Sequence, residues 1–248
     1  MSDPQQPEPR TTDSPRAADS PRAPQPANTP PAQSAQIDSA ISRAANNLVL
    51  WIARHWLALF TTAWGLYVFL PFLAPILLQG GFTAPATLIY TLYSYACHQL
   101  PDHSYFLFGN SLAPNAATLE AAGMPAGPNL FAQRAFVGGA DVGYKVALCQ
   151  RDVAIYGAIF LCGLLFALIR NRLESPSIRV YLLFLIPIAL DGGTQLIGLR
   201  ESNWLLRTLT GALFGAASVW LIYPYVEAAM DEVIETEGAR QTTLPPTS

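Results

Sequence analysis

Four stretches of this chain are apolar over about the twenty residues that an α-helix needs to cross the hydrocarbon core of a bilayer. They cover residues 56–78, 153–169, 180–199 and 204–226 of a 248-residue sequence. Only 12% of the residues are charged, against about 25% in an ordinary soluble domain. The sequence therefore predicts an all-α fold: a polytopic helical bundle spanning residues 55–228 of an integral membrane protein, expected in the plasma membrane.

A fifth apolar segment, residues 84–99, leaves the number of crossings open at four or five. The segment is short, aromatic and partly polar, so it either crosses with difficulty or re-enters the membrane from one face. A full crossing gives five spans and an N-terminus outside the cell. A re-entrant segment gives four spans and an N-terminus inside.

The regions outside the spans differ in character. Residues 1–36 hold nine of the 21 prolines and show no apolar period, which predicts a disordered tail. Residues 37–54 carry apolar side chains at near-helical spacing, as does an amphipathic helix on a membrane surface. Residues 109–143 are a long loop with six glycines and three prolines, with room for a brief helix at 115–122. Residues 229–248 are predicted to be an acidic, flexible tail.

The short connection at 170–179 fixes which loops share a membrane face. It holds three arginines and one glutamate, so the positive-inside rule places it in the cytoplasm. One crossing on either side then puts residues 100–151 and 200–203 on the outer face, and the last span returns the C-terminus to the cytoplasm. This pairing of loops holds even if inside and outside are exchanged.

Cysteine and histidine are rare in the chain, and four of the six lie near the ends of two apolar segments. Cys97 and His98 close one segment, while Cys149 and Asp152 open another. These side chains are predicted ligands for zinc or another divalent transition metal, with His103 as an alternate. Positions 149 and 152 share a face of a helical turn, whereas adjacent residues 97 and 98 require the helix to unwind. A disulfide between the two cysteines stays open, as does an N-cap role for Asp152 before a span that begins at 153.

A second group of polar residues falls within or beside the last two spans. Asp191 lies about eleven residues into its span, and a buried acid there needs a partner, for which Arg207 is the first candidate and Arg200 the second. Asp191 and Arg207 are the candidate catalytic residues. Four further side chains are candidates for substrate binding: Arg151, Gln195, Arg200 and Asn203. Gly211 and Gly215 are four apart, which favours a close helix contact.

Three ordered motifs resemble those of the membrane protein family called domain of unknown function 2085. The first is Cys97-His98-Gln99-Leu100-Pro101-Asp102-His103-Ser104, continuing to Phe106 and Gly109. The second runs from Cys149 to Tyr156, and the third runs from Asp191 to Gly211 with a Gln, an Arg, a Ser-Asn pair and an Arg-x-x-Thr-Gly sequence. The resemblance covers about residues 60–225 and implies the fold and the sites but no activity.

The chain departs from the family pattern at two site residues. Asp152 stands where the second motif has its second cysteine, and His103 stands where the first motif has an arginine. Both exchanges keep metal-ligand capacity and make the ligand set harder. The loop between the first two motifs is also longer than the pattern implies.

Three functions follow as hypotheses, and the sequence leaves open whether the protein is an enzyme. The first is metal-assisted chemistry on a lipid-like or anionic substrate, at an outer-face metal site beside the Arg/Asp pocket. The second is a transporter or channel subunit in which Asp191 and Gly192-Gly193 mark a broken helix near the midplane. The third is a structural or assembly subunit with a Cys97–Cys149 disulfide. Expected partners are membrane lipids and a second copy or other membrane subunits, and the absence of a basic field argues against nucleic acid.

Overall fold

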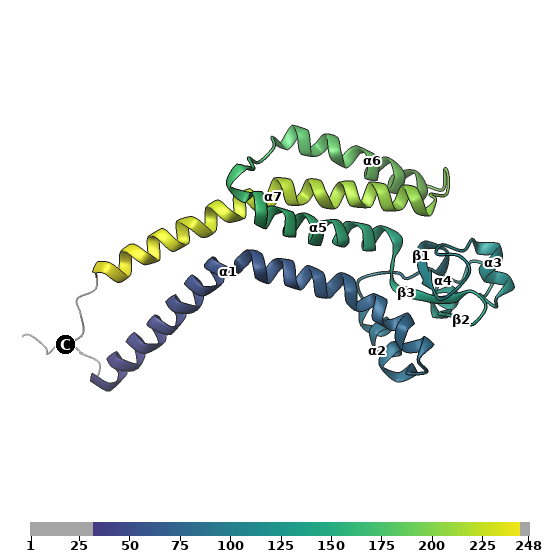
Figure 1. The fold of residues 1–248 in the computed structure, drawn as a ribbon, viewed down its shortest axis with the longest axis horizontal. Helices are drawn as coiled ribbons and strands as arrows, with labels where there is room; N and C mark the ends of the chain where they lie inside the picture. The colour runs from purple at the N-terminus through teal and green to yellow at the C-terminus, as the bar shows by residue number, and fades with distance from the viewer. Residues whose placement is uncertain (1–31, 244–248) are drawn as a thin grey trace, which may run out of the picture. The chain divides into compact units, whose positions relative to one another are not determined.

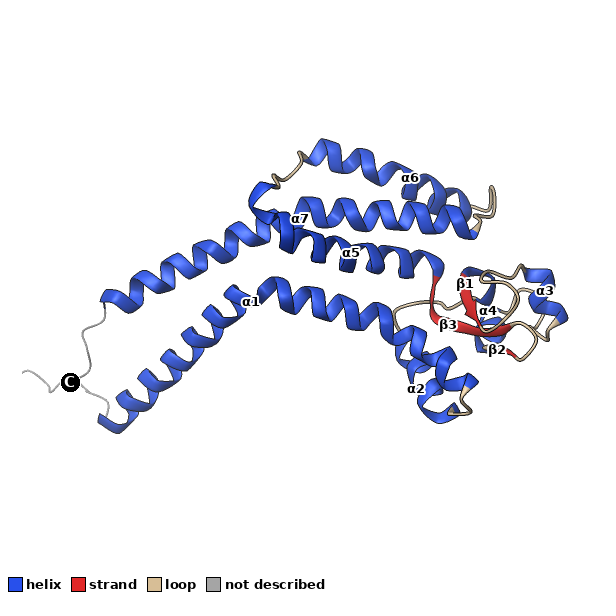
Figure 2. Ribbon diagram, viewed as in Figure 1, coloured by secondary structure: helices blue, strands red, loops and turns tan. Residues whose placement is uncertain are grey.

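The computed structural model describes residues 32–243 and divides the chain into two compact units, residues 1–44 and 45–248. Most of the predicted N-terminal tail therefore lies outside the described residues. Within the described part, four helices are long and apolar enough to cross a membrane (Figures 1 and 2). They are α1 (Ala32–Gln79), α5 (Gln150–Ile169), α6 (Ile178–Leu196) and α7 (Trp204–Thr243). The predicted polytopic helical fold is confirmed.

Large apolar side chains remain uncovered along these helices. Only 6% of the most apolar window of α6 is buried against the rest of the protein, and only 11% of that of α5. Leu182, Leu183 and Leu190 of α6 are all more than half exposed. Such a continuous apolar surface needs lipid rather than water around it.

The second apolar segment does not form a span. Its helix, α2 (Thr83–Tyr93), has 11 residues and is about 16 Å long by helical rise, about half the thickness of the hydrocarbon core. The chain then continues to residue 100 without helix. The choice between four and five spanning helices is thus resolved at four within the described residues.

Both ends of the predicted membrane domain differ from expectation. Residues 32–36 are the first turns of α1, and the predicted surface helix continues without a break into the first span. The predicted flexible tail after residue 228 is wrong up to Thr243, because α7 runs that far. Its last turns contain three glutamates and two alanines, which have high helix propensity, so acidity alone did not indicate flexibility.

A small antiparallel sheet that the sequence did not predict is formed by strands at the two ends of the long loop. Its strands are β1 (Ser104–Leu107), β2 (Gly138–Gly139) and β3 (Gly143–Cys149), in the order β1-β3-β2. Ser104 pairs with Cys149 and Phe106 with Lys145. Three short helical elements accompany the sheet: η1 (Pro101–His103), α3 (Ala116–Ala121) and α4 (Leu130–Ala135). The brief helix expected at 115–122 is confirmed as α3, capped by Asn115.

Glycines let α5 and α7 approach closely, as predicted from their spacing. A Cβ atom at Gly215 would lie 2.3 Å from the carbonyl oxygen of Ile155, and one at Gly211 would lie 2.8 Å from that of Arg151. On the other side of α5, Trp64 of α1 stacks on Tyr156 with ring centroids 5.1 Å apart. These contacts hold the start of α5, and with it the second motif, in a fixed position against α7.

Candidate metal centre

The segment after α2 places Cys97 in the interior. The helix ends at Tyr93, and Gln99 adopts a left-handed conformation with φ of 50°, which is unusual for a residue other than glycine. The Gln99 side chain is buried and donates to the carbonyl oxygen of Tyr90 at 2.9 Å. The unwinding that adjacent Cys97 and His98 require is therefore present, and Cys97 is buried at its centre.

Cys149 sits at the junction of β3 and α5. It is the last residue of the strand and the N-cap of the helix, where its Sγ accepts a hydrogen bond from the backbone N–H of Asp152 at 3.5 Å. The predicted N-cap role of Asp152 is wrong, because α5 begins at Gln150 rather than at 153. Asp152 instead lies in the first turn, which favours a negative side chain and leaves its carboxylate available.

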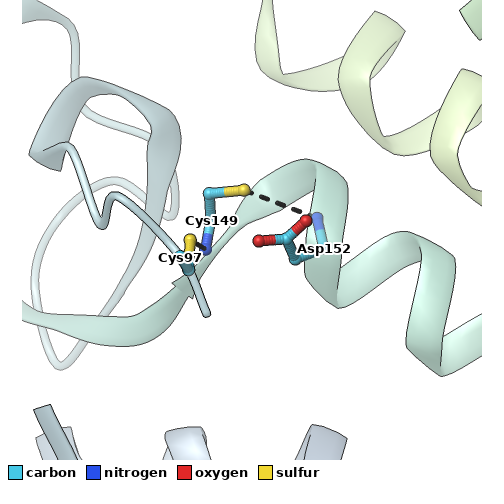
Figure 3. A group of neighbouring side chains, drawn as sticks. All are labelled: Cys97, Cys149 and Asp152. Carbon is cyan, nitrogen blue, oxygen red and sulfur yellow. Dashed lines mark hydrogen bonds between the residues drawn. The ribbon is translucent and has the colours of Figure 1, made fainter. Parts of the chain in front are cut away.

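Three of the four predicted ligands come together. Ligand atoms of Cys97, Cys149 and Asp152 all lie within 4.8 Å of one another, from the α2–η1 connection and the start of α5 (Figure 3). The backbone N–H of Cys149 also donates to Sγ of Cys97 at 3.3 Å. Ligands around a tetrahedral zinc ion are about 3.5–4 Å apart, so a small contraction would close the set on an ion.

The two histidines lie beside this group rather than within it. Both line a cavity of about 570 Å³, referred to below as the site cavity. Its walls comprise Ala96, His98, Leu100, His103, Leu130, Cys149, Arg151, Asp152, Gly192, Gln195, Leu196 and Arg207. The rings of His98 and His103 are 6.0 Å apart at their centroids. The cavity thus opens onto two of the three clustered ligands and carries imidazoles within it.

Hydrogen bonding and burial set the charges of these groups. The hydrogen bond with Cys149 lowers the pKa of the Cys97 thiol, which favours its thiolate. The hydrogen bond with Cys97 raises the pKa of the Cys149 thiol. A hydrogen bond with Cys97 raises the pKa of His98. Burial lowers the pKa of His103 to about 3, so that its ring is neutral and retains a lone pair for a metal or a proton donor.

Asp191 pairs with arginines other than the one first expected. Its carboxylate accepts from Arg151 Nη2 at 2.6 Å and from Arg200 Nη2 at 2.9 Å, and its side chain is 1% exposed. The predicted Asp191–Arg207 pair is not formed, whereas the alternative Arg200 is confirmed as a partner. Arg151 also donates to Gln195 Oε1 at 3.3 Å.

The environment of Asp191 also argues against a broken helix. The α6 helix runs unbroken through Gly192 and Gly193 to Leu196. Asp191 therefore lies five residues before the helix end, about 8 Å by helical rise, on the side of the motif loops rather than at mid-span.

Arg207 lies between the site cavity and a second cavity. Its residue is 5% exposed, and Nη1 reaches the carbonyl oxygen of Asp102 and Oε1 of Gln150, both at 3.4 Å. The buried Nε has no hydrogen-bond partner among the residues that the structure describes. Asn203 lines only the second cavity, which measures about 200 Å³, and its Oδ1 accepts from the N–H of Leu206 at 2.8 Å. Asn203 thus lies at the start of α7 and shares the second cavity with Arg207, outside the wall of the site cavity.

Two buried polar residues that the sequence did not predict, Lys145 and Gln150, support the site. Lys145 is fully buried and donates to the carbonyl oxygens of Gln99 and Arg134 at 3.0 and 2.5 Å. Gln150 donates to the carbonyl oxygen of Ser104 at 3.0 Å. The sequence does mark Lys145 as unusual, because it is the only lysine of the sequence and stands within an apolar run before a span.

The cysteines are free in the structure. Cys97 and Cys149 are buried thiols rather than the disulfide that the sequence left open, and Cys162, within α5, is partly buried. The first two keep sulfur ligands available beside Asp152.

Part of the chain matches a known protein family. Residues 133–221 match the family model described as "Predicted membrane protein (DUF2085)". This range contains the second and third motifs, whereas Cys97 and His98 fall before it. No solved structure matches the chain.

Two archaeal proteins are similar to the chain. The uncharacterized protein MJ1492 of Methanocaldococcus jannaschii is 30% identical over 138 residues, which are 55% of this chain and 67% of that protein. An uncharacterized protein of Methanothermobacter thermautotrophicus is 39% identical over 69 residues, which are 28% of this chain and 62% of that protein.

Proposed function

The chain belongs to the membrane protein family called domain of unknown function 2085, and from this premise we propose that it is a metal-dependent membrane protein. Its ion would be zinc or another divalent transition metal, held by Cys97, Cys149 and Asp152. The observation that carries the proposal is the convergence of two thiols and a carboxylate within 4.8 Å at the wall of a cavity lined by arginines and histidines.

The donor set suits a catalytic rather than a closed structural site. Catalytic zinc sites use three protein ligands and keep a fourth position for water or substrate. Such an ion lowers the pKa of bound water or polarises a carbonyl or phosphoryl oxygen. The site cavity supplies the space for that fourth position, because Cys149 and Asp152 both line it.

The residues around the ligands have separate roles in this proposal. His98 and His103 lie on the cavity wall, where an imidazole can bind the metal as a fourth ligand or exchange a proton with a substrate. The buried Asp191 carboxylate holds Arg151 in place, so that the guanidinium keeps a fixed direction at the cavity. Asp191 is then a positioning residue, and Arg151 and Arg207 are the groups that face a substrate.

The distribution of arginines supports an orientation of the protein in the membrane. The connection between α5 and α6 carries Arg170, Arg172 and Arg179, which the positive-inside rule assigns to the cytoplasm. The metal centre lies at the opposite ends of these helices and would face outward. With four spans, both ends of the membrane domain would then face the cytoplasm.

A transporter receives less support from the same residues. The proposed ion site needed a helix broken beside Asp191, and α6 is continuous there. The Asp191 carboxylate is also occupied by two guanidiniums, which leaves little capacity for a transported cation.

Metal analysis of the purified full-length protein tests the proposal. We expect about one zinc-like ion per chain in the unaltered protein and a loss of most of it in Cys97→Ser and in Cys149→Ser. Cys162→Ser is the matched control, because this third cysteine lies within α5, away from the cluster, and should leave the metal content unchanged. Unchanged stoichiometry in both Cys97→Ser and Cys149→Ser would rule the site out.

A further inference from the structure

Two arginines, Arg151 and Arg207, line the site cavity together with one carboxylate, that of Asp152. Arg151 and Arg200 share the single carboxylate of Asp191. Among the described residues, no carboxylate lies within 4.0 Å of the Arg207 guanidinium, and the nearby Asp102 carboxylate contacts the neutral ring of His103 at 3.3 Å. Of the three arginines, Arg207 is therefore the one that is buried and makes no direct ion pair.

Arg207 is held poorly by the protein itself. Its recorded contacts are two long hydrogen bonds to neutral oxygens, and its Nε is buried without a partner. Asp102 and Asp191 stabilise the charge of Arg207 only from beyond ion-pairing distance. A buried charge without a direct partner is costly, so an anion in the cavity would stabilise Arg207. A guanidinium with an unused N–H suits the oxygens of a phosphate group, which it can contact at two points.

The other walls of the site cavity indicate the rest of the ligand. Leu100, Leu130 and Leu196 line it, and Leu130 and Leu196 are 57% and 88% exposed. Leu196 ends α6, the helix whose apolar surface is least covered. The walls of the site cavity thus combine two arginines with exposed leucines, and one of these leucines, Leu196, ends a lipid-facing helix.

We propose that the site cavity binds a phosphate ester, with the phosphate on Arg207 and Arg151 and any apolar portion against Leu130 and Leu196. This inference deepens the proposed metal-dependent function by naming its substrate class. A phosphate placed there lies beside the clustered thiols and carboxylate, where a bound ion polarises phosphoryl oxygens.

The test uses the full-length protein in maltoside micelles, which contain no phosphate. The soluble probe is glycerol 3-phosphate, followed by calorimetry, and the lipid probe is phosphatidylglycerol, followed by retention in native mass spectrometry. We expect Arg207→Gln to weaken binding at least about tenfold and Arg207→Lys to weaken it less, because the charge remains. Arg170→Gln is the control, since this arginine pairs with Glu227 at the other end of α5.

The outcomes separate the ligand source and the two proposals. Binding of the lipid alone, of the soluble ester alone or of both, lost in Arg207→Gln, supports the inference and identifies the source. Absence of binding to both probes overturns it, as does wild-type affinity in folded Arg207→Gln and Arg207→Lys. Metal content is measured on the same samples, so that Arg207-dependent phosphate binding without metal would reject the metal site and retain the phosphate site.

Discussion

The backbone N–H of Cys149 donates a hydrogen bond to Sγ of Cys97 at 3.3 Å, across 52 positions of sequence. The contact joins the first motif to the second and directs a positive dipole at the Cys97 sulfur. A thiolate is the form that binds metal, so the fold favours the ligand-competent state of Cys97 before any ion is present.

Asp152 determines the hardness of the proposed ligand set. Asp152→Cys replaces an oxygen ligand by a sulfur ligand, and we expect it to raise the affinity for Cd²⁺ relative to Mn²⁺ at least about tenfold. Asp152→Asn removes the charge and should weaken binding of both ions. Competition titrations measure the ratio, with Asp141→Asn as control because Asp141 is an exposed loop acid. An unchanged ratio in Asp152→Cys would show that residue 152 is not a ligand.

Asp191 should matter for stability as well as for the site. Asp191→Asn leaves Arg151 and Arg200 without a carboxylate. Because these arginine side chains are 25% and 42% exposed, we expect a cost below the roughly 3–5 kcal/mol of breaking a fully buried pair. We expect a clear fall in the melting temperature of the purified protein. The exposed Asp231 provides the control substitution Asp231→Asn, and equal melting temperatures of the two variants would contradict the structural role of Asp191.

Close packing of α5 and α7 gives a prediction that is independent of metal. Gly215→Ala would place its Cβ 2.3 Å from the carbonyl oxygen of Ile155, so we expect overpacking to cost about 1–3 kcal/mol. At Gly193 a Cβ would meet nothing within 4 Å, and Gly193→Ala in α6 should be neutral or slightly stabilising. Thermal unfolding of both variants tests this prediction, and a Gly215→Ala protein as stable as the unaltered protein would contradict the close contact.

Lys145 predicts a pH dependence of stability. Burial lowers the pKa of Lys145 to about 7, so between about pH 7 and pH 10 the unfolded chain binds more protons than the folded one. Stability should therefore rise with pH across this window and be lost as pH falls towards 7. Lys145→Met should flatten the rise, as measured by the free energy of unfolding at several pH values. Parallel curves for the two proteins would exclude a buried, shifted lysine.

The sequence predicts the spans from apolar length, and it predicts that the motif loops share one membrane face from the number of crossings between them. Gly211 and Gly215 indicated a close helix contact for a similarly local reason. The open N-cap role of Asp152 depends on a span that begins at its first apolar residue, Val153, whereas α5 begins at Gln150. The N-cap of α5 is Cys149, which is the last residue of β3. No local sequence pattern predicts that strand.

The ion pairs of the site depended on tertiary structure. The sequence predicts an Asp191–Arg207 pair because the next span brings that residue close, whereas the Arg207 side chain points towards Gln150 and the carbonyl oxygen of Asp102. Arg151 reaches Asp191 instead, since the start of α5 lies beside the end of α6. Lys145 and its carbonyl partners likewise follow from the packing of β3 against the segment around Gln99, which single-sequence periodicity does not encode.

X-ray absorption at the zinc edge, on the full-length protein loaded with zinc, tests the central claim most directly. The account predicts two sulfur ligands at about 2.3 Å, with the remaining nitrogen or oxygen ligands at about 2.0–2.2 Å, and loss of the sulfur shell in the Cys97→Ser/Cys149→Ser double variant. A shell of nitrogen and oxygen ligands alone, or a spectrum that the double variant leaves unchanged, would contradict a metal centre built on Cys97, Cys149 and Asp152.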